Sequence, residues 1–382
     1  MDFQLPAADD PRRVAVRAWL AEHPRPTGAV LAAAGYVVPH WPAPYGIGAD
    51  PVHQVIIDEE LARAGVRRPS NPIGIGWAGP TLLYAGTAEQ QERYLPRLLS
   101  GEDFWCQLFS EPGSGSDLAG LGTRALREGD EFIVNGQKIW TSGAQFATFG
   151  ILIARTDPDL PKHKGISYFV CPMDLPGIEI RPIREMTGGE TFNEVFFTDV
   201  RIPAANLVGD LNDGWRLAKV TLGNERVSLS TGGVLWGMGP TAPQVLDALK
   251  AEGPISDSHL RQRLAAVDTE HMLLDLIRLR TVSARLRGAQ PGPEASIRKV
   301  LADEHGQHVM AAARDLLGAA GMLTGDPWYD GFMFSQALTI GGGTGDVQRN
   351  IVAERVLGLP ADVDVQSGMT WAETLRAAPP TT

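Results

Sequence analysis

The stretch Glu131-Phe-Ile-Val-Asn-Gly-Gln-Lys-Ile-Trp140 places β-branched and aromatic residues on both sides of an Asn-Gly pair. This pattern predicts two short strands joined at Asn135-Gly136, because Asn-Gly between apolar runs is the strongest short-range hairpin signal. Similar runs follow at residues 149–155, 166–171, 177–181 and 194–197, separated by turn residues. Short strands at this spacing are typical of a sandwich or barrel. The sequence therefore predicts a β domain over residues 104–209.

On both sides of this region the hydrophobic period becomes helical. The preceding part has such segments at 14–20, 53–63 and 87–96, the last of them behind an N-cap threonine, Thr87. The following part has them at 213–238, 257–287, 293–318 and 344–357. We expect an α+β multidomain protein, mainly α. It would have an N-terminal helical domain (1–103), a middle β-barrel or sandwich domain (104–209) and a C-terminal four-helix bundle (210–382).

Composition excludes several classes of protein. The 382 residues include 34 basic and 45 acidic side chains, a net charge of −11, which argues against nucleic-acid binding. Two cysteines, Cys106 and Cys171, cannot form a disulfide framework. The N-terminus has no apolar signal core, and no apolar run approaches the roughly 18 residues that would cross a bilayer. We expect a cytoplasmic protein without membrane partners.

Two weaker motifs do not predict ligand sites. The segment 74–79 matches G-x-G-x-x-G, but no strand precedes it, so we interpret it as a loop and not as a dinucleotide site. His305 and His308 lie one helical turn apart without an accompanying set of carboxylate or cysteine ligands. We interpret them as a packed or solvated pair and predict no metal site.

Three clusters have the chemistry of a binding site. Residues 104–119 lead from a β-rich run into a loop crowded with Gly, Ser and Pro, and residues 138–144 place an aromatic beside two hydroxyls. In residues 341–347 a glycine run enters a helix at Thr344. A helix entry of this kind offers backbone N–H groups to an anion or a developing oxyanion. Each cluster alone is also compatible with an ordinary loop.

Together with residues 86–96, 316–321 and 342–358, these clusters resemble, in order, the motifs of the acyl-CoA dehydrogenase family of flavoproteins. The resemblance covers nearly the whole chain. It implies a helical, β and helical domain order, with FAD bound between the β domain and the C-terminal bundle. It also implies a homodimer or homotetramer, or a hetero-oligomer, in which a second subunit contributes to the cofactor site.

The resemblance assigns a role to individual positions. Trp140 would cover one flavin edge, Ser142 would lie near N5, and Ser116 would lie by the pyrophosphate or the CoA chain. The implied cofactor contacts are Gln107, Phe109, Ser110, Ser116, Trp140, Ser142, Ala319 and Thr344. The implied substrate contacts are Ser116, Arg226 and Gly342.

The catalytic base is at one of two positions in this family. Many relatives have a glutamate directly before the Gly-Thr of the C-terminal motif, where this chain has Gly342. The isovaleryl-type and long-chain-type branches have it on a helix, followed by arginine, which matches Glu225-Arg226. At 100° per residue, Glu225 shares a face with Ala218, Leu222, Leu229 and Gly232. We expect Glu225 to be the base, Arg226 to orient it or the substrate, and the Gly342 N–H to bind the thioester carbonyl.

The resemblance therefore implies FAD-dependent α,β-dehydrogenation of an acyl-CoA thioester, with a branched, long or bulky acyl group and an electron-transfer flavoprotein as acceptor. Two alternatives stay open. One is the same fold acting on a carrier-bound acyl group or using oxygen. The other is a non-catalytic accessory subunit of a hetero-oligomer, which is motivated by Gln107, Ala319 and Gly342, where many relatives have an aromatic, a glycine and a glutamate.

Overall fold

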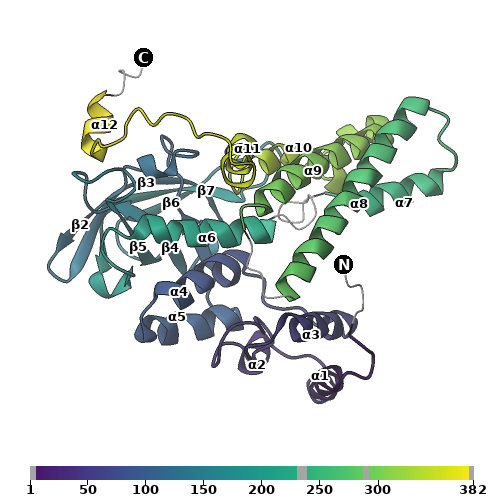
Figure 1. The fold of residues 1–382 in the computed structure, drawn as a ribbon, viewed down its shortest axis with the longest axis horizontal. Coiled ribbons are helices and arrows are strands. Elements are labelled where there is room, and N and C mark those ends of the chain that lie inside the picture. Colours follow the sequence, from purple (N-terminus) through teal and green to yellow (C-terminus); the bar gives the residue numbers. More distant parts are fainter. Residues whose placement is uncertain (1–5, 230–238, 287–291, 378–382) are drawn as a thin grey trace. The chain divides into compact units, whose positions relative to one another are not determined.

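The computed structural model describes residues 6–229, 239–286 and 292–377, which form two compact units (Figure 1). The first unit contains the chain up to residue 184, residues 190–224 and the segment from residue 364 onward. The second contains residues 225–363 together with residues 185–189. The expected fold class is confirmed, since helical N- and C-terminal regions flank a middle sheet.

The N-terminal part of the first unit is helical. Its elements are α1 (Pro11–Glu22), α2 (Gly28–Ala33), α3 (Pro51–Arg63), the π-helical turn η1 (Gly74–Ala78), α4 (Gly79–Ala85) and α5 (Ala88–Ser100). Thr87 caps α5 as expected and forms a reciprocal capping box with Gln90. The segment 74–79 is helical and not a loop, because η1 leads directly into α4. A Cβ on Gly79 would lie 2.3 Å from the Trp41 ring, so helix packing requires this glycine.

The strands form one mixed sheet with the order β6-β7-β3-β2-β4-β5-β8, and β1 pairs with β4. Their bounds are β1 (Trp105–Leu108), β2 (Arg124–Glu128), β3 (Glu131–Ser142), β4 (Phe149–Arg155), β5 (Ile166–Pro172), β6 (Ile178–Pro182), β7 (Phe192–Pro203) and β8 (Leu207–Val208). The predicted strands at 149–155, 166–171, 177–181 and 194–197 all lie in this sheet.

The prediction of a hairpin at Asn135-Gly136 is wrong. β3 passes unbroken through both residues, and its register against β7 shifts there, so the pair forms a bulge. The chain reverses instead at Gly129, which has φ 61° and joins β2 to β3. A Cβ on Gly136 would lie 2.4 Å from Thr123 Oγ1, so the glycine serves a close approach between strands and not a turn.

β4 is buried on both of its faces. Ile151 and Ile153 pack in a core shared with the N-terminal helices, whereas Leu152 and Ala154 pack in a core formed within the β domain. Successive residues of a strand point to opposite faces, so a strand between two cores needs an unbroken apolar run. This requirement explains the sequence of residues 149–154 and anchors the sheet to the N-terminal helices.

The second unit is helical. Its elements are the end of α6 (Gly214–Leu229), α7 (Ala242–Glu252), α8 (Ser258–Leu286), α9 (Ala295–Leu317), η6 (Gly318–Met322), α10 (Pro327–Phe334), η7 (Ser335–Thr339), α11 (Gly345–Ile351) and the π-helical turn η8 (Val352–Val356). α7, α8 and α9 share a core that includes Val245, Leu264 and Val309. Among the described helices, none is long and apolar enough to span a membrane.

The C-terminal segment returns to the first unit, where α12 (Trp371–Ala377) ends the described chain (Figure 1). The Trp371 indole N–H donates to the Gly120 carbonyl at 3.1 Å, and its backbone N–H donates to the Leu160 carbonyl at 2.9 Å. The buried Arg155 guanidinium lies 4.8 Å from the centroid of the Trp371 ring. The segment therefore holds the loop that follows the Gly/Ser-rich cluster.

Candidate functional site

Several of the residues implied in flavin binding lie where the chain leaves β1 and runs beside β3. Gln107 belongs to β1, and Phe109 and Ser110 follow it directly. The Ile139 N–H donates to the Ser110 carbonyl at 2.9 Å. This bond places Ser110 beside the β3 segment that contains Trp140, so the first and second motif clusters form one site.

A buried ion pair holds the two clusters together. Lys138 is fully buried, and its Nζ donates to the Phe109 carbonyl at 3.0 Å and to the Glu111 carboxylate at 2.7 Å. The same carboxylate accepts the backbone N–H groups of Gly122 and Thr123 at 2.7 and 3.0 Å. One side-chain pair therefore fixes β1, β3 and the Gly/Ser-rich loop relative to one another.

Burial and mutual attraction shift the pKa of both members of this pair. Burial lowers the pKa of Lys138, and the charge of Glu111 offsets part of that effect. Burial would raise the pKa of Glu111, but the Lys138 charge and the hydrogen bonds to the carboxylate outweigh it, so the pKa lies below its ordinary value. The pair therefore supports the loop through charge-assisted hydrogen bonds.

The Gly/Ser-rich loop is open on its outer side. Glu111 and Ser114 exchange two backbone hydrogen bonds and close a tight turn. Ser116 is exposed just beyond it. A Cβ added to Gly113 or Gly115 would meet nothing within 4 Å, so the chain's own packing requires neither glycine. The loop leaves room for a ligand to approach the backbone closely.

Trp140 has a strained backbone on β3. Its φ is 61°, in the left-handed region that bulky residues rarely adopt. The pairing of β3 with β7 shifts register between Lys138 and Thr141, so the strain coincides with a bulge. The indole ring is 58% exposed and meets the Phe192 ring edge-on at 6.1 Å. The bulge therefore turns a large aromatic ring outward beside Ser142, which is partly buried.

We predict that Trp140→Gly stabilises the FAD-free protein by about 1 kcal/mol, because glycine adopts this φ without strain and the exposed ring contributes little packing. Denaturant unfolding after FAD removal measures this difference. The same variant is expected to bind FAD more weakly by flavin fluorescence. A clear loss of stability in the FAD-free variant would show that the ring is structural.

The candidate base lies on a buried face of α6. Glu225 is 6% exposed, Ala218 is fully buried on the same face, and Leu222 is partly buried. The side chains of Arg226 and Leu229, and all of Gly232, lie outside the described residues. The burial of a carboxylate on an apolar face is the environment expected of a base rather than of a solvated surface residue.

A buried group of hydroxyls fixes α6 one helical turn before Glu225. Thr221 Oγ1 lies 2.8 Å from Thr81 Oγ1 of α4 and 3.1 Å from the Tyr168 hydroxyl of β5. The Tyr168 ring in turn meets the Phe109 ring edge-on at 6.0 Å. These contacts bind α6 to both the N-terminal helices and the sheet.

The third motif cluster is the glycine run directly before α11. Gly342 and Gly343 have φ values of 70° and 92°, so both lie in the left-handed region. A glutamate at position 342 would be strained there. Thr344 caps α11, because its hydroxyl oxygen accepts the Val347 N–H at 3.3 Å. Ala319 lies exposed on η6.

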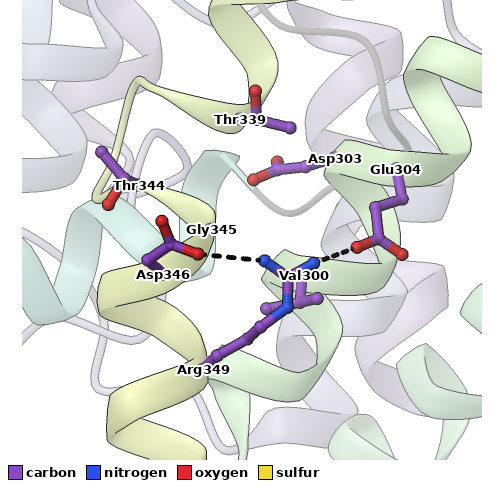
Figure 2. Close-up of a pocket in the computed structure, with 8 residues that line it drawn as sticks. All are labelled: Val300, Asp303, Glu304, Thr339, Thr344, Gly345, Asp346 and Arg349. Carbon is purple, nitrogen blue, oxygen red and sulfur yellow. Dashed lines mark hydrogen bonds and ion pairs between the residues drawn. The ribbon is translucent and has the colours of Figure 1, made fainter.

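A cavity of about 200 Å³ opens beside Thr344 (Figure 2). Figure 2 shows Arg349 bridging Asp346 of its own helix and Glu304 of α9. Asp303 is buried at its wall, and burial raises the pKa of this carboxyl to about 6 although Lys299 opposes the shift. The lining is Val300, Asp303, Glu304, Thr339, Thr344, Gly345, Asp346 and Arg349. Its surplus of carboxylates disfavours a phosphate inside it.

The sequence analysis assigned no role to Lys138, Glu111 or Thr221. Lys138 had a signal that could have identified it, because it occupies an inward position of β3 in register with Phe132 and Val134, where a charged side chain needs a buried partner. No local pattern in the sequence identifies Glu111 as that partner.

The two histidines of the pair differ in their exposure to solvent. His305 is buried, His308 is exposed, and their Nδ1 atoms lie 3.1 and 2.9 Å from the Glu270 carboxylate. Burial lowers the pKa of His305, although Glu270 acts in the opposite direction. Within the described ranges, no three His, Cys, Asp or Glu side chains gather as metal ligands would.

Comparison with known proteins covers nearly the whole chain. The family models for the N-terminal, middle and C-terminal domains of acyl-CoA dehydrogenase match residues 9–102, 106–200 and 212–357. The chain is 46% identical over 330 residues to acyl-CoA dehydrogenase FadE34 of Mycobacterium tuberculosis, a match that covers 86% of this chain and 45% of FadE34. The chain thus spans less than half the length of that relative.

Two further proteins are similar over most of their own length. Acyl-CoA dehydrogenase IpdE1 of Mycolicibacterium smegmatis is 39% identical over 348 residues, which cover 87% of each chain. A solved structure described as "Tcur3481-Tcur3483 steroid ACAD" has a TM-score of 0.78 and 32% identity, and the match covers 95% of this chain and 100% of that one. The chain therefore belongs to the acyl-CoA dehydrogenase family, whose members are FAD-dependent flavoprotein oxidoreductases.

The first unit fits the family's cofactor. Gly113 and Gly115 leave the loop backbone accessible, and the exposed indole of Trp140 is held by a strained bulge. Ser110 and Ser142 are partly exposed on either side of that bulge. These residues offer hydroxyls, N–H groups and an aromatic face, which suit a flavin and its phosphates.

Proposed function

We propose that this chain catalyses the α,β-dehydrogenation of an acyl-CoA thioester, with Glu225 as the base that removes the α proton. The burial of Glu225 supports the assignment, because a carboxylate that is 6% exposed on the apolar side of α6 is shielded from bulk water, as a catalytic base in a closed site would be. The left-handed backbone at Gly342 supports it as well, because it disfavours a glutamate at the family's other base position.

The reaction breaks two C–H bonds and forms one C=C bond. The α hydrogen passes to the Glu225 carboxylate as a proton, and its electron pair becomes the new double bond while the β hydrogen leaves with its electrons. The acceptor of that hydride would be FAD, which supplies the redox chemistry of the reaction when it is bound. The Gly342 N–H donates to the thioester carbonyl oxygen and stabilises the charge that develops there, an interaction typically worth about 3 kcal/mol. Arg226 orients the carboxylate or the substrate.

The first unit supplies the cofactor contacts in this proposal. Phe109, Ser110 and Gln107 would line the flavin ring, Trp140 would cover one edge and Ser142 would hydrogen-bond near N5. Ser116, exposed at the end of the open loop, contacts the pyrophosphate or the CoA chain. Thr344 and Ala319 contribute from the C-terminal unit, which also contains the base.

The proposed substrate carries a bulky acyl group, and the electrons pass to an electron-transfer flavoprotein. Gly342 has no side chain and leaves space next to the reacting carbons. The similarity to a steroid acyl-CoA dehydrogenase supports a ring-bearing acyl group. A homodimer or homotetramer, or a mixed complex, would complete the cofactor site.

The test is reduction of the bound flavin, followed at its visible band, with straight, branched and ring-bearing acyl-CoA esters. We expect ring-bearing esters to bleach the flavin faster than butyryl-CoA does. If no acyl-CoA reduces the flavin of the intact oligomer while a carrier-bound acyl group does, the CoA assignment is wrong. Rapid reoxidation by oxygen instead of by an electron-transfer flavoprotein would indicate an oxidase.

A second candidate function is that of a subunit in a hetero-oligomeric dehydrogenase. The similar steroid enzyme is described by two joined chain names, and Gln107 and Ala319 depart from many relatives at cofactor positions. Expression of this chain alone and with a candidate partner separates the cases. A colourless or insoluble chain that turns yellow only with a partner would support a shared FAD site.

A further inference from the structure

We propose that Gln348 is a positioning residue for the thioester carbonyl, because its side-chain amide fixes the backbone that presents the Gly342 N–H. This inference rests on the proposed function, in which that N–H binds the carbonyl oxygen. Gln348 touches no substrate in the proposal and acts through Gly342.

The contacts that carry the inference lie within one turn of the chain. Gln348 is fully buried on α11, and its Nε2 donates to the Gly342 carbonyl at 3.1 Å. A Cβ added to Gly343 would lie 2.4 Å from that same Nε2. The loop therefore passes close to the amide group, and the φ of 92° at Gly343 favours glycine at this position.

Three successive glycines, Gly341 to Gly343, form a very free backbone, so the conformation of this loop needs external support. Gly341 is held on the other side, since its N–H donates to the Ala337 carbonyl at 2.9 Å. Gln348 supplies the second attachment at the Gly342 carbonyl. Among the described residues, the Gly342 N–H donates no hydrogen bond to the chain.

The amide of Gln348 is costly where it lies. Its Oε1 is buried and finds no hydrogen-bond partner among the described residues. A buried acceptor without a partner destabilises the fold, and an apolar side chain of the same length would avoid that cost. The single bond to the Gly342 carbonyl is thus the one interaction in the described structure that an amide provides here and methionine does not.

The helix that bears Gln348 is itself anchored. Thr344 caps its first turn, and Arg349 joins it to Glu304 of α9 (Figure 2). Because α11 is fixed at both ends, Gln348 holds the loop against a stable support instead of moving with it.

The test compares Gln348→Met and Gln348→Glu in the FAD-loaded oligomer, with Gln307→Met as the matched control. Gln307 is a partly buried amide of α9 that donates to the Ser335 carbonyl at 3.3 Å and to the Thr339 hydroxyl at 3.4 Å, and its described hydrogen bonds include none to the glycine loop itself. Two readouts are measured: the KM and kcat for flavin reduction, and the C=O stretch of a ¹³C-labelled thioester. The probe has sulfur in place of the β carbon, so it binds but has no β hydrogen to transfer as a hydride.

We expect Gln348→Met to lower kcat by about 10- to 100-fold, a part of the loss seen when an oxyanion donor is removed. KM and FAD content should stay within about twofold of wild type. The C=O stretching frequency of the labelled, bound thioester should move toward the frequency of the free thioester in solution. Gln348→Glu should recover activity at low pH, where its protonated carboxyl donates an O–H to the Gly342 carbonyl. Gln307→Met should change neither readout.

An unchanged stretch and kcat in both Gln348 variants would overturn the inference while leaving the proposed function intact. The proposed function itself fails by a different observation: no acyl-CoA reduces the flavin of the wild-type protein. If Gln348→Met does not fold, Gln348→Glu, which keeps the side-chain shape, decides the question. The inference is also contradicted if Gln348→Glu is as active at high pH as at low pH and the C=O stretching frequency of its bound thioester equals that in the wild type.

Discussion

Replacement of Glu225 by glutamine is expected to give a yellow, folded protein whose flavin is reduced by acyl-CoA about 10²- to 10⁴-fold more slowly than in wild type. Glutamine keeps the shape of the side chain but has no site basic enough to accept the α proton. The buried position of Glu225 leaves bulk water poorly placed to replace it. Stopped-flow measurement at the visible flavin band, with the best ester from the acyl-CoA series, gives the rate.

Glu354→Gln is the matched control, because Glu354 is a partly buried glutamate of the same unit without a proposed role. It should reduce its flavin at the wild-type rate. If Glu225→Gln also does so, the base lies elsewhere. If Glu225→Gln loses FAD, the role of Glu225 is structural.

Lys138→Met is expected to lower the free energy of unfolding by about 3–5 kcal/mol, since it leaves the largely buried Glu111 carboxylate without its cation. The variant should also lose FAD, because Lys138 holds the Phe109 carbonyl and the Gly/Ser-rich loop in place. Urea denaturation and the ratio of flavin to protein absorbance measure the two effects.

Two variants control this prediction. Lys138→Met/Glu111→Gln should recover part of the lost stability, because a neutral amide oxygen still accepts the N–H groups of Gly122 and Thr123. Lys162→Met removes the more exposed pair with Asp117 and should cost less than about 1 kcal/mol. If the free energy of unfolding of Lys138→Met lies within 1 kcal/mol of the wild-type value, the buried pair does not support the loop.

The fold was predictable because its signals are local and repeated. The change from helical to strand periodicity and back needed only the order of apolar residues, as the unbroken run of β4 between two cores shows. The hairpin at Asn135-Gly136 failed because an Asn-Gly pair also fits a bulge. A bulge forms here instead of a hairpin because Thr123, directly before the neighbouring strand, closely approaches Gly136. The residues around Gly136 in the sequence do not indicate this contact.

The site was predictable only as separate motifs. The motif residues at Ser110 and Trp140 were recognised in sequence, but the ion pair of Lys138 with Glu111 that joins them spans 27 residues. The contact of Thr81 with Thr221, which fixes the helix of the base, spans 140 residues. Such pairings depend on how the elements pack, and no spacing rule within a single sequence reports them.

The most direct measurement is exchange of the α hydrogen by NMR in D₂O, with the FAD-loaded protein and the acyl-CoA analogue that has sulfur in place of the β carbon. This probe separates proton removal from hydride transfer, because its β position has no hydrogen to give. The account predicts that wild type replaces the α hydrogen with deuterium and that Glu225→Gln does so about 10²- to 10⁴-fold more slowly. Equal exchange by the two proteins would contradict it.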